Sequence, residues 1–238
     1  VIGKLVDILP ITYANSFNAR LIGIDAAGNI EYCIPGDSGK VTRLIPPDSG
    51  WMGIKSVSLY QNFLHVLDPG GNAVYRYKGK GLLFEESPTL YFDNVVPPLA
   101  YAVDIEVNGD ELYILRSTGE MVECTYSHIK DYKLTECTDP APYGDMREGK
   151  NATPIIFTDA QFVQMRMTQA PDSSLYLLDQ KGQRLYHLSL QRNLQKVMQP
   201  GYSGKDSTPQ GAATAIAISP GRMLFIAFQN RIYAAPLP

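Results

Sequence analysis

Residues 174–190, SLYLLDQKGQRLYHLSL, decide the fold. The run 175–178 is apolar without polar alternation, and it therefore predicts a strand that is covered on both faces. Asp179 and Gly182 follow with the residue types of a tight turn, because Gly adopts a positive φ without steric cost. A second extended run begins at Leu185. Together these features predict a buried β-hairpin.

The same pattern recurs along the chain. Each copy has an apolar run, a turn that usually contains Gly, and a second run with an apolar or aromatic centre. The other copies are LIGIDAAGNIEYCI (21–34), LHVLDPGGNAVYRY (64–77), LYILRSTGEMVECTY (112–126) and LFIAFQNRIYAAP (224–236). Successive copies start about 43, 48, 63 and 49 residues apart, a spacing typical of four-stranded propeller blades.

One polar position repeats with the pattern. Asp25, Asp68 and Asp179 stand at equivalent places before the turn, whereas Arg116 and Phe228 replace the Asp in the other two copies. Since Asp hydrogen-bonds backbone groups in turns, the repetition indicates a turn-former rather than a catalytic acid.

Candidate flanking strands accompany these hairpins, with apolar inner strands and more polar outer ones, as blade packing requires. We therefore predict an all-β fold, a single β-propeller domain over residues 1–238 with five recognisable four-stranded antiparallel blades. A sixth blade or a closing strand outside the chain is the alternative. Residues 4–9 could form the innermost strand of the first blade or the strand that closes the last one. Because the chain begins at Val1, we expect it to be excised or processed from a larger protein and linked there to another domain.

The repeats resemble those of the NHL and SMP-30-like propeller lineage, in which a "DIA" inner strand precedes a "LYVLD" strand, a Gly-containing turn and an "RI" strand. The matching residues are Val103-Asp104-Ile105 with 112–115, 175–179 with Arg184-Leu185, and less closely 224–227 with Arg231-Ile232. The resemblance implies the propeller architecture. SMP-30-like enzymes hold a divalent metal with acidic and amide side chains, and a matching set does not occur at the inner positions here. We therefore expect no metal and no cofactor.

The composition excludes some kinds of partner. Of the 238 residues, 45% are hydrophobic and 19% charged, with 20 Gly, 17 Pro and 15 Tyr, which favours strands and turns. The net charge is −3 and no basic block occurs, so we expect no nucleic-acid surface. No apolar run reaches the length of a membrane span.

The three cysteines suggest one bond. Cys124 and Cys137 flank a predicted hairpin, where a disulfide could join two strands; the alternative is two buried free thiols. Cys33 has no evident mate. The Tyr-rich, Lys-poor composition and this disulfide favour a location outside the cytoplasm, although the sequence assigns no compartment.

Function is expected in the loops that do not repeat, because long variable loops on a rigid scaffold usually bind ligands. We predict a non-catalytic binding or scaffolding module whose inter-blade loops recognise a protein or carbohydrate partner. The predicted contact residues, mostly aromatic, are Trp51, Tyr101, Tyr143, Arg147, Asp159 and Tyr202. A lectin with one site per blade is disfavoured because the loops differ between units.

The alternative is a carbohydrate-active enzyme. Asp7 and Asp104 stand in matching VDI settings, and paired carboxylates in a propeller channel could hydrolyse glycosides. Against this, the corresponding Asp of NHL-like repeats is usually structural. The equivalent residues of the other units are predicted to be Ser58, Arg166 and Ala217. We therefore favour a non-enzymatic role.

Overall fold

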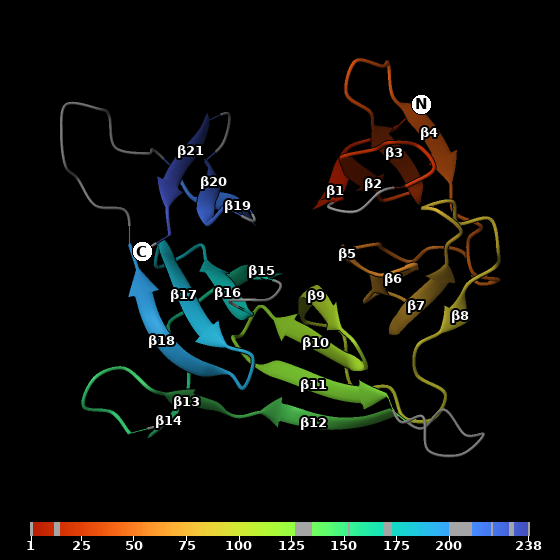
Figure 1. The fold of residues 1–238 in the computed structure, drawn as a ribbon. Helices are drawn as coiled ribbons and strands as arrows, with labels where there is room; N and C mark the ends of the chain where they lie inside the picture. The colour runs from red at the N-terminus through yellow and green to blue at the C-terminus, as the bar shows by residue number, and fades with distance from the viewer. Residues whose placement is uncertain are drawn as a thin grey trace. The chain divides into compact units, whose positions relative to one another are not determined.

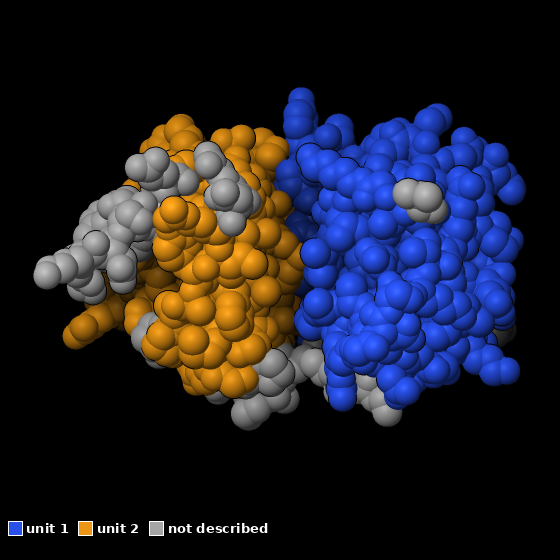
Figure 2. Space-filling view, turned by 90° about the horizontal axis from the view of Figure 1, so that it is seen from above, with its two compact units in different colours: residues 1–114, 123–139 blue, residues 115–122, 140–238 orange. Residues whose placement is uncertain are grey.

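The computed structural model describes residues 2–11, 15–126, 135–151, 153–168, 173–199, 211–219, 221–228 and 231–237. The described residues form 21 β-strands and no helix (Figure 1). No membrane-spanning helix is therefore found among them. The chain divides into two compact units, residues 1–114 with 123–139 (unit 1) and residues 115–122 with 140–238 (unit 2), coloured separately in Figure 2.

The strands form five sheets, one for each predicted repeat, and each sheet is taken from consecutive strands of the chain (Figure 1). The first contains β1 (Leu5–Pro10), β2 (Leu21–Asp25), β3 (Asn29–Cys33) and β4 (Lys40–Arg43). The second contains β5 (Ser56–Tyr60), β6 (Phe63–Asp68), β7 (Ala73–Lys78) and β8 (Thr89–Leu90). The third contains β9 (Ala102–Asn108), β10 (Glu111–Arg116), β11 (Met121–Tyr126) and β12 (Thr135–Ala141).

The last two sheets differ from the four-stranded pattern: the fourth has six strands, and the described part of the fifth has three. The fourth has the order β14 (Thr153–Ile155), β13 (Tyr143–Asp145), β18 (Asn193–Met198), β17 (Arg184–Ser189), β16 (Ser174–Asp179) and β15 (Phe162–Met167). The described part of the fifth has β19 (Ala213–Ile218), β20 (Met223–Phe228) and β21 (Arg231–Pro236). The prediction of an all-β chain with five antiparallel propeller blades is confirmed.

The ambiguous first strand is assigned by its pairing. β1 runs antiparallel to β2, with Asp7 opposite Ile24 and Pro10 opposite Leu21. It is therefore the innermost strand of the first blade. The alternative, that residues 4–9 complete the last blade, is wrong.

The second strands of the first four blades are buried as the apolar runs predicted, whereas in β20 of the fifth blade only Leu224 and Phe228 are buried. Every residue of β16 is buried, and β6 and β10 are buried except for their first residues. By contrast, all four residues of β4 are at least partly exposed. Because fully burying a Leu or Val side chain stabilises a fold by about 1.5–3 kcal/mol, these middle strands dominate the core.

The repeated Asp residues join two parts of the first, second and fourth blades. Each carboxylate accepts a backbone hydrogen bond from its own turn, and a second from the segment that leads into the inner strand of its blade. The second donors are the N–H groups of Gly3 to Asp25 (2.7 Å), Met52 to Asp68 (2.9 Å) and Gln161 to Asp179 (2.9 Å). The predicted turn-forming role is confirmed by the bonds to Ala27, Gly71 and Gly182. The link to the inner strand was not predicted.

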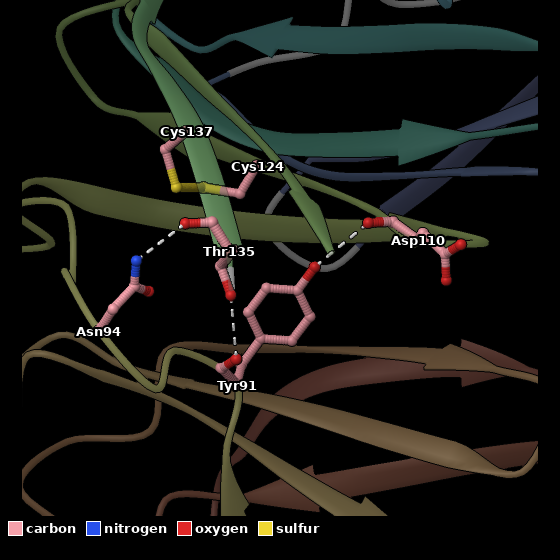
Figure 3. Close-up of a disulfide and its surroundings, with 6 residues drawn as sticks. All are labelled: Tyr91, Asn94, Asp110, Cys124, Thr135 and Cys137. Atoms are coloured by element: carbon pink, nitrogen blue, oxygen red, sulfur yellow. Dashed lines mark hydrogen bonds between the residues drawn. A yellow bond between two sulfur atoms is a disulfide. The ribbon is translucent and has the colours of Figure 1, made fainter. Parts of the chain in front are cut away.

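The proposed disulfide is present. Cys124 of β11 and Cys137 of β12 are joined, with their Cα atoms 4.0 Å apart (Figure 3). Thr135, two residues before Cys137, donates from Oγ1 to the carbonyl of Tyr91 (3.4 Å), and the Tyr91 hydroxyl donates to the carbonyl of Asp110 (3.4 Å). The outer strands of the third blade are thus tied to each other and to the segment that follows β8. Cys33 is free and exposed.

Candidate functional site: an edge groove on the fourth blade

The long segment between the third and fourth blades forms additional strands rather than a plain loop. β13 pairs with β14 in antiparallel fashion and with β18 in parallel, with Gly144 opposite Asn193. A sheet edge offers unpaired N–H and C=O groups. The N–H groups of Gly144 and Met146 donate to the carbonyls of Arg192 and Leu194 at the start of β18. The sequence predicts an inter-blade loop here. In the structure it extends the outer edge of the fourth blade instead (Figure 1).

This extension encloses an open groove of about 490 Å³. We call it the edge groove. One side comes from the extension, and the other comes from β17, β18 and the residue after β18. The lining residues are Arg147, Ile155, Ile156, Phe157, Arg184, Tyr186, Leu194, Val197 and Gln199. All of them belong to unit 2.

An aromatic cluster supports the groove from below. The Phe157 ring meets Tyr143 (4.9 Å between centroids), Tyr186 (4.9 Å) and Phe162 (5.3 Å) in edge-to-face geometry. Such pairs add about 0.5–1.5 kcal/mol beyond their burial. Gly119, with φ +95°, leaves the necessary space, because a Cβ there would lie 3.2 Å from both phenylalanine side chains. The cluster holds the segment 155–157 against the blade.

The two groove arginines differ in their partners. Arg147 binds Asp145 with two parallel bonds, from Nε to Oδ1 (2.9 Å) and from Nη2 to Oδ2 (2.7 Å). This pairing lowers the pKa of Asp145 and raises that of Arg147. Arg184 is exposed, and its Nη1 donates to the Tyr186 hydroxyl at 3.5 Å, which raises the pKa of Arg184. Among the described residues Arg184 has no ion pair, although Asp179 and Asp159 act on it electrostatically.

The groove also exposes aliphatic surface. Ile156 is 86% exposed, and Ile155 beside it is half-buried. An isolated exposed Ile is ordinary, but Ile156 follows the half-buried Ile155, and both line the groove together with the half-buried Val197.

The structure brings together only part of the predicted contact set. Tyr143 is buried beneath Phe157, burial raises its pKa, and its hydroxyl has no partner among the described atoms. Arg147 lines the groove, and Asp159 is exposed two residues after Phe157.

The other predicted residues do not join this set. Trp51 lies in unit 1, where its ring packs on Tyr75 (5.6 Å) and Tyr77 (6.3 Å) and covers the core. Tyr101, also in unit 1, is 67% exposed. Tyr202 lies outside the described residues.

Sequence reasoning missed Ile155, Ile156, Arg184 and Tyr186. The signal for the first two was the apolar run PIIF at 154–157 inside an otherwise polar segment. Arg184 and Tyr186 stand in the repeat itself, and we had interpreted that repeat as scaffold alone.

The carboxylates of the enzyme alternative also meet, in unit 1. Asp7 of β1 and Asp104 of β9 both lie on inner strands, as predicted, and are only 8% and 2% exposed. The Ser56 hydroxyl contacts Asp7 Oδ2 at 3.0 Å and also contacts Asp104 Oδ1. Backbone N–H groups of Ile8 and Ile105 donate to the two carboxylates at 2.8 and 2.9 Å. Each acid is therefore buried and hydrogen-bonded.

The strand registers correct the predicted equivalences. Asp7, Ser56, Gln164 and Ala215 each stand opposite the residue that precedes the Asp25, Asp68, Asp179 or Phe228 position. The prediction of Ser58, Arg166 and Ala217 was therefore shifted by two residues.

Asp7 and Gln164 make the same kind of bond. Asp7 Oδ2 accepts from the N–H of Val57 (3.1 Å), and Gln164 Oε1 accepts from the N–H of Ile216 (2.5 Å). Each donor follows the equivalent position of the next blade. The amide oxygen of Gln164 and the carboxylate of Asp7 accept equivalent bonds, so this bond joins neighbouring blades and does not require an acid. Among the described residues there is no group of three or more His, Cys, Asp or Glu that could hold a metal ion.

Comparison with known proteins shows the fold. No protein-family model matches the chain, and no curated protein matches its sequence. The crystal structure of a nidogen/laminin complex contains a chain that is 14% identical, with a TM-score of 0.60 over 97% of this chain and 76% of that chain. Virginiamycin B lyase from Staphylococcus aureus is 14% identical, with a TM-score of 0.56 over 98% and 88%. The Cps50 (Swd1) β-propeller domain of Myceliophteria thermophila is 13% identical, with a TM-score of 0.54 over 97% and 68%.

At this level of identity the similarity shows the β-propeller class and nothing narrower. No family match accompanies the resemblance to NHL and SMP-30-like propellers.

Proposed function

We propose that this chain is a non-catalytic propeller module that binds a protein partner at the edge groove. The observation that carries the proposal is Ile156, which is 86% exposed at the mouth of an open groove and is held there by the aromatic cluster around Phe157. Contiguous apolar surface of this kind marks interaction sites on soluble proteins.

A protein partner suits the groove better than a carbohydrate. Sugars stack on exposed aromatic faces, but Tyr143 and Tyr186 are each only 6% exposed. Besides the half-buried Phe157 and the polar Gln199, the accessible side chains of the groove are aliphatic and cationic. The groove is also open, so a small molecule would leave much of its own surface in water, whereas a protein segment is covered by the rest of its own fold.

The fold is compatible with this role without requiring it. One similar structure is, by its title, a complex of nidogen with laminin, and another is a lyase. A propeller serves as a scaffold for either kind of site, so the argument rests on the groove and not on the neighbours.

The glycosidase alternative has less support. Asp7 and Asp104 would have to contact a substrate, yet both are buried and bonded to Ser56. The hydrogen bond from the Val57 N–H to Asp7 has its counterpart in the bond from the Ile216 N–H to Gln164. Because Gln164 carries an amide, this bond does not require a carboxylic acid. We therefore assign these carboxylates to the scaffold. The Cys124–Cys137 disulfide supports an oxidising, extracytoplasmic setting for the module.

A display selection tests the proposal. Random 12-residue peptides are selected on the folded chain, and the enriched peptides are then measured against Ile156→Asp. We expect the variant to lose binding at an unchanged melting temperature, because the side chain is exposed. The matched control is Val95→Asp in unit 1, at a residue that is 72% exposed and distant in sequence from the groove residues. Enriched peptides that bind Ile156→Asp as well as wild type, or no enrichment at all, would refute the proposal.

A further inference from the structure

We infer that the partner presents an extended acidic segment, in which an Asp or Glu side chain pairs with Arg184 and a neighbouring apolar side chain packs against Ile155 and Ile156. This inference rests on the proposed function and specifies its ligand.

The charge of the groove selects an acid. Arg147 is bound by both oxygens of Asp145. Arg184 has only the Tyr186 hydroxyl at 3.5 Å and no ion pair among the described residues. A guanidinium presents several donors in a planar fork that fits a carboxylate, so Arg184 is the group that can accept an incoming acid.

The apolar part of the groove lies beside this charge. Ile155 and Ile156 come from the extension, and Val197 comes from β18 on the other side. A segment that places an acid on Arg184 would therefore have apolar surface within reach of its adjacent residues. The volume of about 490 Å³ is within the range of about 300–1,000 Å³ typical of small ligand sites, enough for a few side chains.

Side chains rather than an added strand should make the contact. β14 is the outermost strand of its sheet, and Pro154 is the middle one of its three residues. Proline has no N–H to donate, and natural sheets use it to block the pairing of an edge with another chain. The backbone of β14 is therefore a poor template for strand addition. For the same reason a free carboxyl terminus, which is usually captured by backbone N–H groups, is not the occupant that we infer.

A nearby acid, Asp159, provides a control variant that should strengthen the binding of an acidic segment rather than weaken it. Asp159 and Asp179 act on Arg184 electrostatically without forming an ion pair with it, and Asp159 is exposed. An incoming carboxylate would be repelled by Asp159. Removing that charge should strengthen the binding of an acidic segment and weaken that of a basic one.

The test uses an enriched peptide from the selection above, in wild-type form and with its acidic residue changed to the amide. Both peptides are measured against wild type, Arg184→Gln, Asp159→Asn and Lys196→Gln. Lys196 is the matched control, because it is an exposed cation on β18 next to Val197 but does not line the groove. The peptide is measured with a free and with an amidated carboxyl terminus.

We expect Arg184→Gln to weaken the acidic peptide about two- to fivefold and to make the acid-to-amide change nearly silent, which is the signature of a direct pair. Asp159→Asn should tighten binding about twofold, whereas Lys196→Gln should leave it unchanged. Amidation of the terminus should have no effect.

Equal losses in Arg184→Gln and Lys196→Gln, additive effects of the two changes, or enriched peptides without an acid would overturn the inference. So would dependence on a free terminus. In each of these cases the loss of binding in Ile156→Asp would still support the proposed function. Its absence would remove both.

Discussion

Polar groups on the inner strands of unit 1 and at the edge groove of unit 2 differ in burial and in their bonding partners. In unit 1, Asp7 and Asp104 are almost fully buried and meet at the Ser56 hydroxyl. In unit 2, Arg184 is exposed and has no ion pair among the described residues, while Ile156 beside it is 86% exposed.

The difference shows where titratable groups mark function in this chain. Asp7, Ser56 and Asp104 on the inner strands have little access to water, so their polar groups must be paired within the protein. A cluster of acids there is consistent with a scaffold. The outer edge of a blade has no such constraint, and an unpaired charge can persist there beside apolar surface.

The largest predicted effect removes the bridge between the inner acids. Ser56→Ala should lower the free energy of unfolding by about 3–4 kcal/mol. The single hydroxyl proton of Ser56 lies between two buried acids, and its removal leaves one buried carboxylate short of a donor, which costs more than the roughly 1–3 kcal/mol typical of a neutral group. Urea denaturation measures the loss. Ser49→Ala, at an exposed serine, is the control and should change stability by less than about 0.5 kcal/mol. A loss below about 1 kcal/mol in Ser56→Ala would mean that the inner network is not a stabilising device.

The second prediction concerns the covalent link of unit 1. The double variant Cys124→Ser, Cys137→Ser should lose about 3 kcal/mol, as expected for a crosslink that spans 13 residues. Cys33→Ser is the control, since Cys33 is free and exposed. If the double variant unfolds at the same urea concentration as the control, the third blade does not depend on this bond.

Periodicity predicted the scaffold because the physical requirement is local. A strand covered on both faces must be apolar throughout, and the run Leu175–Leu178 shows this without any knowledge of its neighbours. The turn role of Asp179 followed from its repetition as Asp25 and Asp68. Their additional bonds to Gly3, Met52 and Gln161 could not be predicted, because those donors lie outside the hairpin that repeats.

The equivalent residues of the inner strands were predicted incorrectly for a different reason. Pairing shifts by one residue between Leu5 and Asp7, and again between Phe162 and Gln164. Such irregularities change which residue faces which partner, but they leave no mark in an alternation pattern. The sequence therefore indicated that inner acids exist, but matched Asp7 to the wrong residue of the second blade.

Two residues of the predicted contact set lie at the edge groove, since Arg147 lines it and Tyr143 packs against Phe157. Their role in binding stays a prediction. Arg184 and Tyr186 were not recognised, because a residue on the third strand of a repeat looks structural until the insertion is seen to pack against it.

The third prediction concerns Asp25, the turn carboxylate of the first blade, for which we expect an effect of intermediate size. Asp25 is 2% exposed; burial alone would raise its pKa, but hydrogen bonds from the Asn29 side chain and from the N–H groups of Gly3, Asn29 and Ala27 outweigh this and lower it. Because the pKa is lower in the folded chain than in the unfolded one, the carboxylate adds stability above about pH 4, and this is lost as the pH falls through the folded value.

Asp25→Asn should therefore cost about 1–2 kcal/mol at pH 7 and less at pH 3, as measured by urea denaturation at both values. Asp37→Asn is the control, because Asp37 is exposed and its carboxylate, among the residues that the structure describes, bonds only to the neighbouring Ser38. A difference between Asp25→Asn and wild type that does not shrink at pH 3 would show that charge plays no part in this turn.

The smallest predicted effect on stability belongs to the groove. Ile156→Asp should change the free energy of unfolding by less than about 0.5 kcal/mol, and Arg184→Gln should shift the melting temperature by less than about 2 °C, because exposed side chains away from caps and crosslinks seldom stabilise a fold. The same two changes are expected to have the largest effects on peptide binding. If either one destabilises the chain as much as Ser56→Ala does, the groove is part of the scaffold. The contrast between hydrogen-bonded acids on the inner strands and an arginine without an ion pair at the edge groove would then no longer indicate where the chain binds its partner.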